Sequence, residues 1–234
     1  MLMGHSEFLV SNIKPNRDKA LMLAKREVGV LVHDSILLEG INFTLPEVHT
    51  LLEGVTVGGH ALSDQQITVN QGNAWRYLFA KVKAGKFCFS LEFLCALHAE
   101  AAKEEALEWG CLRSGGVTIA GSNYLPPKAE ELNRNFSELL ASMNAYDDIY
   151  DKAIHVFLSM ARNQFFYDVN KRMGRLMMNG ILLTAGYPPL NLSAKYKLKF
   201  NELMMRFYDS GDEAEMNLFM RSCIDPKFVE IMCE

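Results

Sequence analysis

The chain lacks the cysteine patterns of a disulfide framework or a structural metal site. Among its 234 residues the five cysteines are an odd number, and no two of them have CxxC spacing. They are Cys88, Cys95, Cys111, Cys223 and Cys233. Unpaired thiols are typical of a reducing compartment, so we expect five free cysteines.

Long apolar runs are absent as well. No stretch approaches the roughly 18 consecutive apolar residues that cross a bilayer. Residues 1–16 lack the basic segment, apolar run and small-residue cleavage site of a signal peptide. We therefore expect a cytoplasmic protein that makes no use of a membrane.

The charge balance gives no excess of basic residues. Lys and Arg number 24 against 28 Asp and Glu, for a formal net charge of −4. A broad basic surface is thus excluded, which disfavours a nucleic-acid polymer as partner. The sequence has no GxxxxGK[ST], HExxH or GxSxG motif, and a hydrophobic fraction of 49% excludes intrinsic disorder.

Along most of its length the chain does have the apolar periodicity and the capping signals of helices. Leu21, Ala24, Val28 and Leu31 recur along one helix face. Residues 44–47 have capping-box spacing with a proline in the first turn, and residues 63–66 form a second such pattern. Further helices are expected over 90–108, 128–143, 147–164, 171–185, 193–208 and 212–224. The fold class is therefore predicted to be all-α.

One stretch, residues 113–127, departs from the helical pattern. The β-branched residues Val117, Thr118 and Ile119 lie between glycines, a pattern that favours a short β-hairpin or flap. We expect one small β element on an otherwise helical bundle.

Residues 162–175 concentrate positive charge, with four basic residues and one acid in an acidic protein. Asp168 is a suitable N-cap for a helix beginning near Lys171, where backbone N–H groups favour an anion. Arg172 and Arg175 are three residues apart, so both guanidinium groups reach along one face, and Asp168 could hold Mg²⁺ between phosphates. This pattern predicts a Mg-nucleotide pocket; the alternative is an ordinary solvated helix start with a capping aspartate.

The same segment resembles the Fic family motif HxFx(D/E)GNGRxxR, aligned on Phe166, Asp168, Asn170, Arg172 and Arg175. Residues 110–127 look like the family's flap, and residues 176–188 like the helix and turn after the motif. Upstream, Ser35, Glu39 and Gly40 are similar to the inhibitory helix pattern (S/T)xxxE(G/N) of one Fic class. The resemblance implies a Fic-type helical bundle, with an N-terminal segment over 1–70 and a core over 71–234.

The resemblance also implies a reaction: transfer of AMP from ATP to a hydroxyl of a target protein, with ATP and Mg²⁺ required. Asp168 would hold the metal and Asn170 would contribute to the anion hole. Lys171, Arg172, Gly174 and Arg175 would bind the nucleotide, and Glu39 with Ser35 would restrain Arg175. The flap at Val117, Thr118 and Ile119 would hold the target by strand addition. Relatives of this kind often dimerise, so a homodimer is a further expectation.

Three departures from the motif weaken this expectation. Gln164 stands where the family has its proton-accepting histidine, and a glutamine amide has no pKa near neutrality. Val169 and Lys171 replace two glycines. We expect an autoinhibited transferase that is weakly active or inactive. Two alternatives stay open: a nucleotide-binding pseudoenzyme that regulates or binds another protein, and a Doc-like phosphotransferase suggested by residues 170–172.

Overall fold

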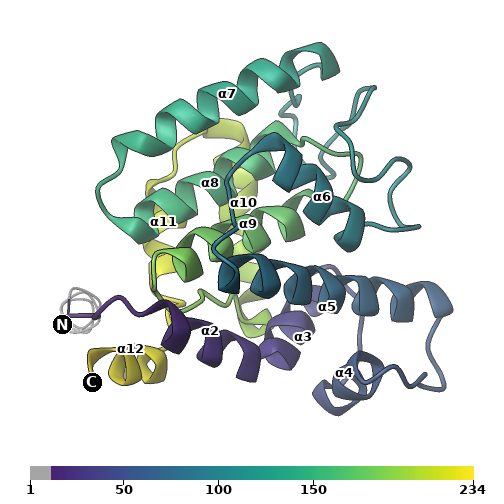
Figure 1. Cartoon of the computed structure of the whole chain (residues 1–234). Helices are drawn as coiled ribbons and strands as arrows, with labels where there is room; N and C mark the ends of the chain where they lie inside the picture. Colours follow the sequence, from purple (N-terminus) through teal and green to yellow (C-terminus); the bar gives the residue numbers. More distant parts are fainter. Residues whose placement is uncertain (1–11) are drawn as a thin grey trace.

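The computed structural model describes residues 12–234; residues 1–11, which include most of the stretch considered as a signal peptide, lie outside it. The described residues form helices joined by loops, with no strand (Figure 1). The α-helices are α2 (Arg17–Arg26), α3 (Val28–Leu38), α4 (Leu45–Leu52), α5 (Leu62–Lys83), α6 (Leu91–Ala101), α7 (Leu132–Ser142), α8 (Ile149–Asn163), α9 (Asn170–Thr184), α10 (Lys197–Ser210), α11 (Ala214–Arg221) and α12 (Pro226–Cys233). Short 3₁₀ turns occupy Ala129–Glu131, Met143–Ala145 and Ala194–Tyr196. The all-α prediction is confirmed.

Helix starts follow local capping chemistry where the sequence offers it. The predicted capping box of Thr44 and Glu47 opens α4, with each side chain bonded to the other's backbone N–H. Asp148 caps α8 by accepting from two backbone N–H groups. The second predicted box is wrong: α5 begins after Ala61 without a side-chain cap, so Ser63 lies inside the helix. The single apolar face expected over residues 21–31 is carried by two helices, which separate at Glu27.

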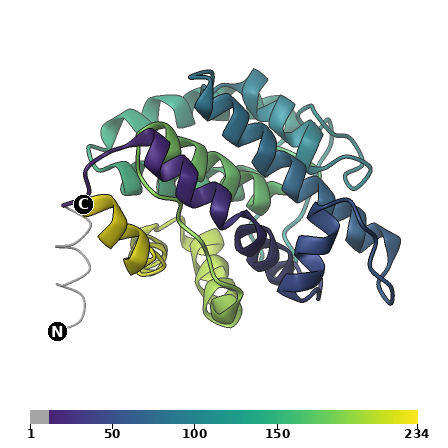
Figure 2. The ribbon, with the colours of Figure 1, turned by 60° about the horizontal axis from the view of Figure 1, so that its bottom comes forward.

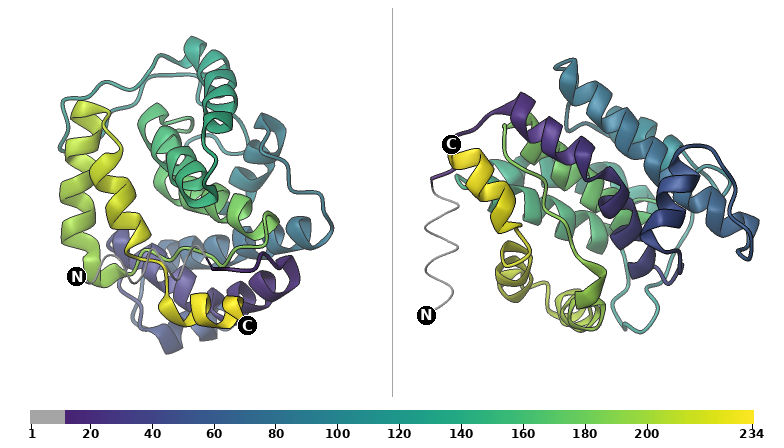
Figure 3. Two further views of the ribbon diagram at one scale, coloured as in Figure 1. Left: turned by 90° about the vertical axis from the view of Figure 1, so that its left-hand side faces the viewer. Right: turned by 90° about the horizontal axis from the view of Figure 1, so that it is seen from below.

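Helix α9 lies at the centre of the bundle and is buried along most of its length. It packs along α8 on one side and against α5, α6 and α2 on others (Figure 1). Helices α10 and α11 run side by side on one flank of the α8–α9 pair (Figure 3). The described N-terminal segment lies beside α12, where the Lys14 N–H donates to the Met232 carbonyl (Figure 2). The motif at the start of α9 is thus surrounded by elements from the whole chain.

A single hydrophobic core runs through the N-terminal helices and the rest of the bundle. The expected boundary at residues 70 and 71 falls inside the continuous helix α5. The division into a 1–70 segment and a 71–234 core therefore remains a prediction about function. Within the described part of the chain, every helix is too short or too polar to span a bilayer.

The expected β-hairpin is absent from the described residues, which is a correction. Residues 117–127 follow an irregular path in the long loop between α6 and α7 (Figure 1). No ladder forms there; the one backbone bond that closes a turn runs from the Ser122 N–H to the Ile119 carbonyl. The β-branched residues favour extended backbone, but a strand needs a partner, and none of the described residues supplies one.

Candidate functional site

The loop between α8 and α9 begins and ends in left-handed backbone conformation. Gln164, the C-cap of α8, has φ +47°, and Val169, which precedes α9, has φ +67°. The left-handed region suits glycine and strains a β-branched residue. Val169 is 3% exposed, so its buried side chain helps to hold the strained turn in place. The backbone therefore keeps the shape that a glycine would adopt at this position of the motif.

The side chain of Asn170 holds this loop closed. Its Oδ1 accepts from the Phe166 N–H at 2.9 Å, and its Nδ2 donates to the Phe166 carbonyl at 2.7 Å and to Gln164 Oε1 at 3.0 Å. The Gln164 amide Nε2 donates to the Ala161 carbonyl at 2.6 Å. Both side-chain amides are thus used inside the loop. Only the backbone N–H of Asn170 is left to face an anion, rather than its side chain as the anion-hole expectation suggests.

Asp168 does not cap α9, which corrects the sequence prediction. Its carboxylate accepts from the neighbouring Val169 N–H at 2.6 Å, and its side chain is exposed. Helix α9 starts at Asn170, one residue earlier than expected, and has no side-chain cap. An uncapped helix N-terminus presents free N–H groups and the positive end of the helix dipole. This start of α9 can therefore receive an anion, with a carboxylate beside it.

Arg172 points into a buried ion pair with Glu105, a residue from the loop after α6. Nη1 donates to Glu105 Oε2 at 3.0 Å, and Nη2 contacts the other carboxylate oxygen. The two side chains are 4% and 12% exposed. Burial lowers the pKa of Arg172, but the hydrogen bond and charge of Glu105 outweigh it and raise the pKa above its ordinary value. The guanidinium group is therefore charged, and both of its terminal nitrogens are bonded to Glu105.

Arg175 and Lys171 share one carboxylate, Glu39 at the C-terminus of α3. Arg175 Nη2 lies 3.2 Å from Glu39 Oε1 and 3.1 Å from Ser35 Oγ, and Lys171 Nζ lies 3.3 Å from Glu39 Oε2. Burial by itself would raise the pKa of Glu39. The positive charges of Arg175 and Lys171 more than offset this, so the pKa of Glu39 lies below its ordinary value. Glu39 is thus held ionised against two basic residues of the motif. The structure brings Ser35, Glu39 and Arg175 together, as the resemblance leads one to expect.

These contacts offset most of the positive charge of residues 162–175. Lys171, Arg172 and Arg175 are opposed by carboxylates from two distant elements, Glu39 and Glu105. The fourth basic residue, Arg162, lies over the Tyr124 ring, 4.4 Å from its centre. The concentration of basic residues in the sequence is therefore largely neutralised within the fold.

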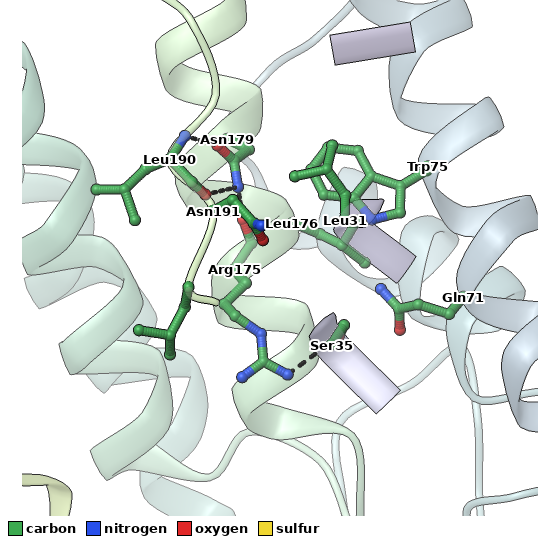
Figure 4. A pocket seen from close by; sticks show the side chains of 10 residues that line it. Leu31, Ser35, Gln71, Trp75, Arg175, Leu176, Asn179, Leu190 and Asn191 are labelled. Carbon is green, nitrogen blue, oxygen red and sulfur yellow. Dashed lines mark hydrogen bonds between the residues drawn. The ribbon is translucent and has the colours of Figure 1, made fainter. Parts of the chain in front are cut away.

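A pocket lies beside Arg175 and Ser35, between α3, α5, α9 and the segment after α9 (Figure 4). Three residues that line it carry buried polar atoms with no hydrogen-bond partner among the described residues: Gln71 Oε1, Trp75 Nε1, Arg175 Nε and Arg175 Nη1. Asn179 closes the pocket by bonding both backbone groups of Leu190. Arg175 therefore keeps Nε and Nη1 without a partner among the described residues, while its Nη2 is bonded to Glu39 and Ser35.

Two glycines of the predicted site have packing and turn roles. A Cβ on Gly174 would lie 2.9 Å from Phe157 Cδ2 and 3.2 Å from its carbonyl oxygen. Gly174 thus lets α8 and α9 approach closely, and it faces α8 rather than the uncapped end of α9. Gly40 has φ +92° and follows the C-cap Glu39, so it ends α3 in the conformation that glycine adopts most easily.

Arg113 is a structural hub that the sequence did not single out. Its guanidinium donates to the carbonyl oxygens of Gln164 at 2.5 Å, Gly115 at 2.6 Å and Pro127 at 2.5 Å, and its side chain is 2% exposed. These bonds join Gly115, just before the 117–127 segment, and Pro127, at its end, to the end of α8. Val117 and Ile119 are half-buried while Thr118 is exposed, so Thr118 faces outward.

His98 is the second residue that the sequence did not reveal. Its ring stacks on Phe166 with centroids 3.7 Å apart, Nδ1 accepts from the Gly110 N–H, and Nε2 lies 3.4 Å from the Asp168 carbonyl. Burial lowers the pKa of His98 to about 4, so the ring is neutral at pH 7. It supports the motif loop from behind, and no periodicity distinguishes it from other residues on the apolar face of α6.

Part of the chain matches a known protein family. Residues 88–182 match the Fic/DOC family. The protein adenylyltransferase Fic of Drosophila willistoni is 24% identical over 222 residues, which cover 89% of this chain and 42% of that protein. The chain thus spans less than half the length of this curated relative.

Solved structures show the same fold. Fic-1 (residues 134–508 of that protein) from C. elegans superposes with a TM-score of 0.76 at 16% identity, covering 98% of this chain and 67% of that one. A Fic domain containing signaling protein from Bacteroides thetaiotaomicron has a TM-score of 0.76 at 17% identity, with 97% and 96% of the two chains covered. At these identities the likeness establishes the fold.

Proposed function

Because residues 88–182 match the Fic/DOC family, we propose that the protein transfers AMP from ATP to a hydroxyl group of a target protein. The observation that carries the proposal is the start of α9, where an uncapped helix N-terminus coincides with Lys171, Arg172 and Arg175. Backbone N–H groups and guanidinium forks are the groups that bind phosphate oxygens. Relatives similar along most of this chain are named protein adenylyltransferases, which selects AMP transfer among phosphate chemistries.

Mg²⁺ fits the donors present beside this anion site. Mg²⁺ in nucleotide sites is held by one or two carboxylates together with substrate phosphates. Asp168 is an exposed carboxylate at the start of α9, with one oxygen bonded to the Val169 N–H. Asp168 would hold the metal, which would neutralise charge on the phosphates. The chain's own contribution is to orient the phosphates with the N–H groups of α9 and the side chains of Arg172 and Arg175.

Glu39 restrains this activity in our proposal. It occupies Arg175 and Lys171 together, so phosphates must displace a carboxylate that already has two cationic partners. Ser35 fixes the same Arg175 nitrogen from the preceding turn of α3. The basic residues become available to a nucleotide only when Glu39 turns away.

Gln164 makes the transfer slow. It can orient a hydroxyl but cannot remove its proton, and a general base contributes roughly 10²–10⁴-fold to such reactions. Its amide is engaged by Ala161 and Asn170, which favours the second candidate function, a nucleotide-binding pseudoenzyme acting through a partner protein. The Doc-like alternative depends on Lys171, whose ammonium group is paired with Glu39.

The target is proposed to bind along residues 117–127. This segment lacks a strand partner among the described residues and is joined to the motif loop through Arg113. An extended peptide could pair with its backbone. We also propose a cytoplasmic location, because the cysteines of the described residues form no disulfide, and leave a homodimer as a prediction to be tested by sedimentation.

The test compares wild type, Glu39→Gly and Glu39→Gly/Gln164→His for Mg-ATP binding by calorimetry and for AMP adducts by intact mass. Glu53→Gly is a matched control, because Glu53 caps α4 as Glu39 caps α3, and a glycine follows each. We expect ATP to bind Glu39→Gly more tightly than wild type or the control, and AMP adducts to rise strongly in the double variant. AMP adducts formed by the single variant Glu39→Gly would rule out the pseudoenzyme alternative. Absence of ATP binding in every variant would overturn the proposed nucleotide site at the start of α9.

A further inference from the structure

We propose that Glu105 acts as an acidic latch on Arg172, as Glu39 does on Arg175. It releases the guanidinium group only to a ligand that offers a pair of anionic oxygens in its place. The inference rests on the proposed function, in which phosphates bind at the start of α9. It adds a residue outside the matched motif that sets which ligands can enter. The occupant it selects is a nucleoside di- or triphosphate over a monophosphate.

The geometry of the Glu105–Arg172 pair differs from that of Glu39. Glu105 engages two nitrogens of one guanidinium group, each through a different oxygen. Glu39 instead divides its oxygens between two side chains, Arg175 and Lys171. A bidentate pair is more specific in geometry than a single contact, so a competitor must reproduce the fork. The two carboxylates share no hydrogen-bonded partner, although the charge of Arg172 also acts on Glu39.

The loop that carries Glu105 is fixed in place. Asn70 Nδ2 donates to the Lys103 carbonyl at 2.7 Å, and the Ala102 carbonyl accepts from the Glu105 N–H at 3.1 Å. At the far end, the Gly110 N–H donates to His98 Nδ1 at 3.1 Å. The backbone around Glu105 is therefore held on both sides, and the carboxylate is presented to Arg172 from a defined position.

Backbone strain next to Glu105 supports this reading. Glu104 has φ +60°, one of three non-glycine residues with positive φ in the described chain; the others, Gln164 and Val169, bound the motif loop. Strained conformations persist only where surrounding contacts determine them, and they gather at functional sites. All three such residues lie in the motif loop or in the loop that holds its arginine.

The buried charge of Arg172 is the reason why the site would select a polyphosphate over a monophosphate. Arg172 is buried, and one of its nitrogens, Nε, has no partner among the described residues. Removing Glu105 without replacement would leave a buried unpaired cation, which is costly. A ligand must therefore bring its own negative charge to the fork as Glu105 leaves. A polyphosphate can do so while another phosphate occupies Arg175, whereas a monophosphate cannot serve both sites.

The experiment measures binding of Mg-ATP and of AMP to Glu39→Gly and to Glu39→Gly/Glu105→Gln by calorimetry. The substituted glutamine keeps the size of the Glu105 side chain but loses its charge. We expect ATP to bind the double variant at least about tenfold more tightly than Glu39→Gly, with AMP gaining relatively more than ATP. Glu39→Gly/Glu108→Gln is the matched control, because Glu108 lies in the same loop and bonds Ser114 instead of Arg172.

Thermal unfolding accompanies each titration, because the loss of a buried charge partner destabilises the fold. If Glu39→Gly/Glu105→Gln does not fold, Glu39→Gly/Glu105→Asp replaces it. The aspartate side chain is one methylene shorter, which holds its carboxylate back from Arg172, and the expected gain is about threefold. Equal ATP affinity with and without the Glu105 substitution would overturn the latch while leaving the proposed function standing. Failure of Glu39→Gly itself to bind ATP would remove both.

Discussion

Arg113 Nε donates a hydrogen bond to the backbone carbonyl of Gln164 at 2.5 Å, which joins the loop between α6 and α7 to the residue that ends α8. Burial lowers the pKa of Arg113, and backbone carbonyls surround its guanidinium group in place of a carboxylate. The last carbonyls of α8 carry the negative end of the helix dipole, which favours a cation there. Arg113 thereby sets the position of the 117–127 segment relative to the motif.

Replacing Arg113 with lysine should destabilise the protein by about 3 kcal/mol, because lysine cannot fork to several carbonyls and leaves buried acceptors unpaired. Urea unfolding measures the change. Arg134→Lys is the control, since that side chain is exposed and pairs only with Glu131 and Glu138, and it should stay within about 0.5 kcal/mol of wild type. An equal effect of the two substitutions would contradict the role of Arg113 as a hub.

Val169→Gly should cost only about 1 kcal/mol of unfolding free energy, although the valine is buried. Loss of the side chain costs about 2 kcal/mol, and relief of the left-handed strain returns about 1 kcal/mol. Val156→Gly removes an equally buried valine from the ordinary backbone of α8 and should cost about 3–4 kcal/mol. Similar costs at the two positions would mean that Val169 carries no strain.

Gly174→Ala should destabilise the fold by about 1–3 kcal/mol, because the added Cβ meets Phe157 in the tight contact between α8 and α9. ATP affinity in the Glu39→Gly background should be unchanged, since Gly174 faces α8. Gly116→Ala, where a Cβ meets nothing within 4 Å, is the stability control. A large loss of ATP affinity with no loss of stability would return Gly174 to the nucleotide site.

His98 should make the protein less stable as the pH falls from about 6.5 to about 4. Burial lowers its folded pKa to about 4, whereas the unfolded ring titrates near 6.5. Between these values the unfolded state binds the extra proton, so stability present above pH 6.5 is lost on acidification, by up to about 3 kcal/mol. Unfolding of wild type and His98→Gln at pH 7, 5.5 and 4.5 measures this. A slope that persists in His98→Gln would assign it to another group.

The sequence predicted the helical class and most of the helix positions well, because local signals determine them. The capping box of Thr44 and Glu47 is an example in which neighbouring residues suffice. Helix α6 was predicted to run to residue 108 but ends at Ala101. The helical pattern there gives way to a loop whose Glu104 adopts positive φ, and tertiary contacts fix that loop.

The site was predictable only in part. The Fic-like motif identified Arg172 and Arg175, and the spacing of Ser35 and Glu39 indicated one of their partners. Glu105 lies 67 residues before Arg172 in an acidic stretch without a pattern, so only the folded chain brings the two together. The expected hairpin failed for a related reason, since strand formation depends on a second strand and not on β-branched residues alone.

The burial of α3 has a consequence for how fast its carboxylate can respond. Leu31, Val32 and Ile36 are no more than 4% exposed, and Asp34 bonds Asn191 and the Ala194 N–H. The helix cannot leave its place without opening the core, so its amide protons should exchange with solvent only about as often as the whole domain unfolds. Glu39, at the end of that helix, needs only a change of rotamer to release Arg175 and Lys171, a motion much faster than unfolding of the domain. The basic residues of α9 can therefore be exposed by movement of the Glu39 side chain alone, while α3 stays in place.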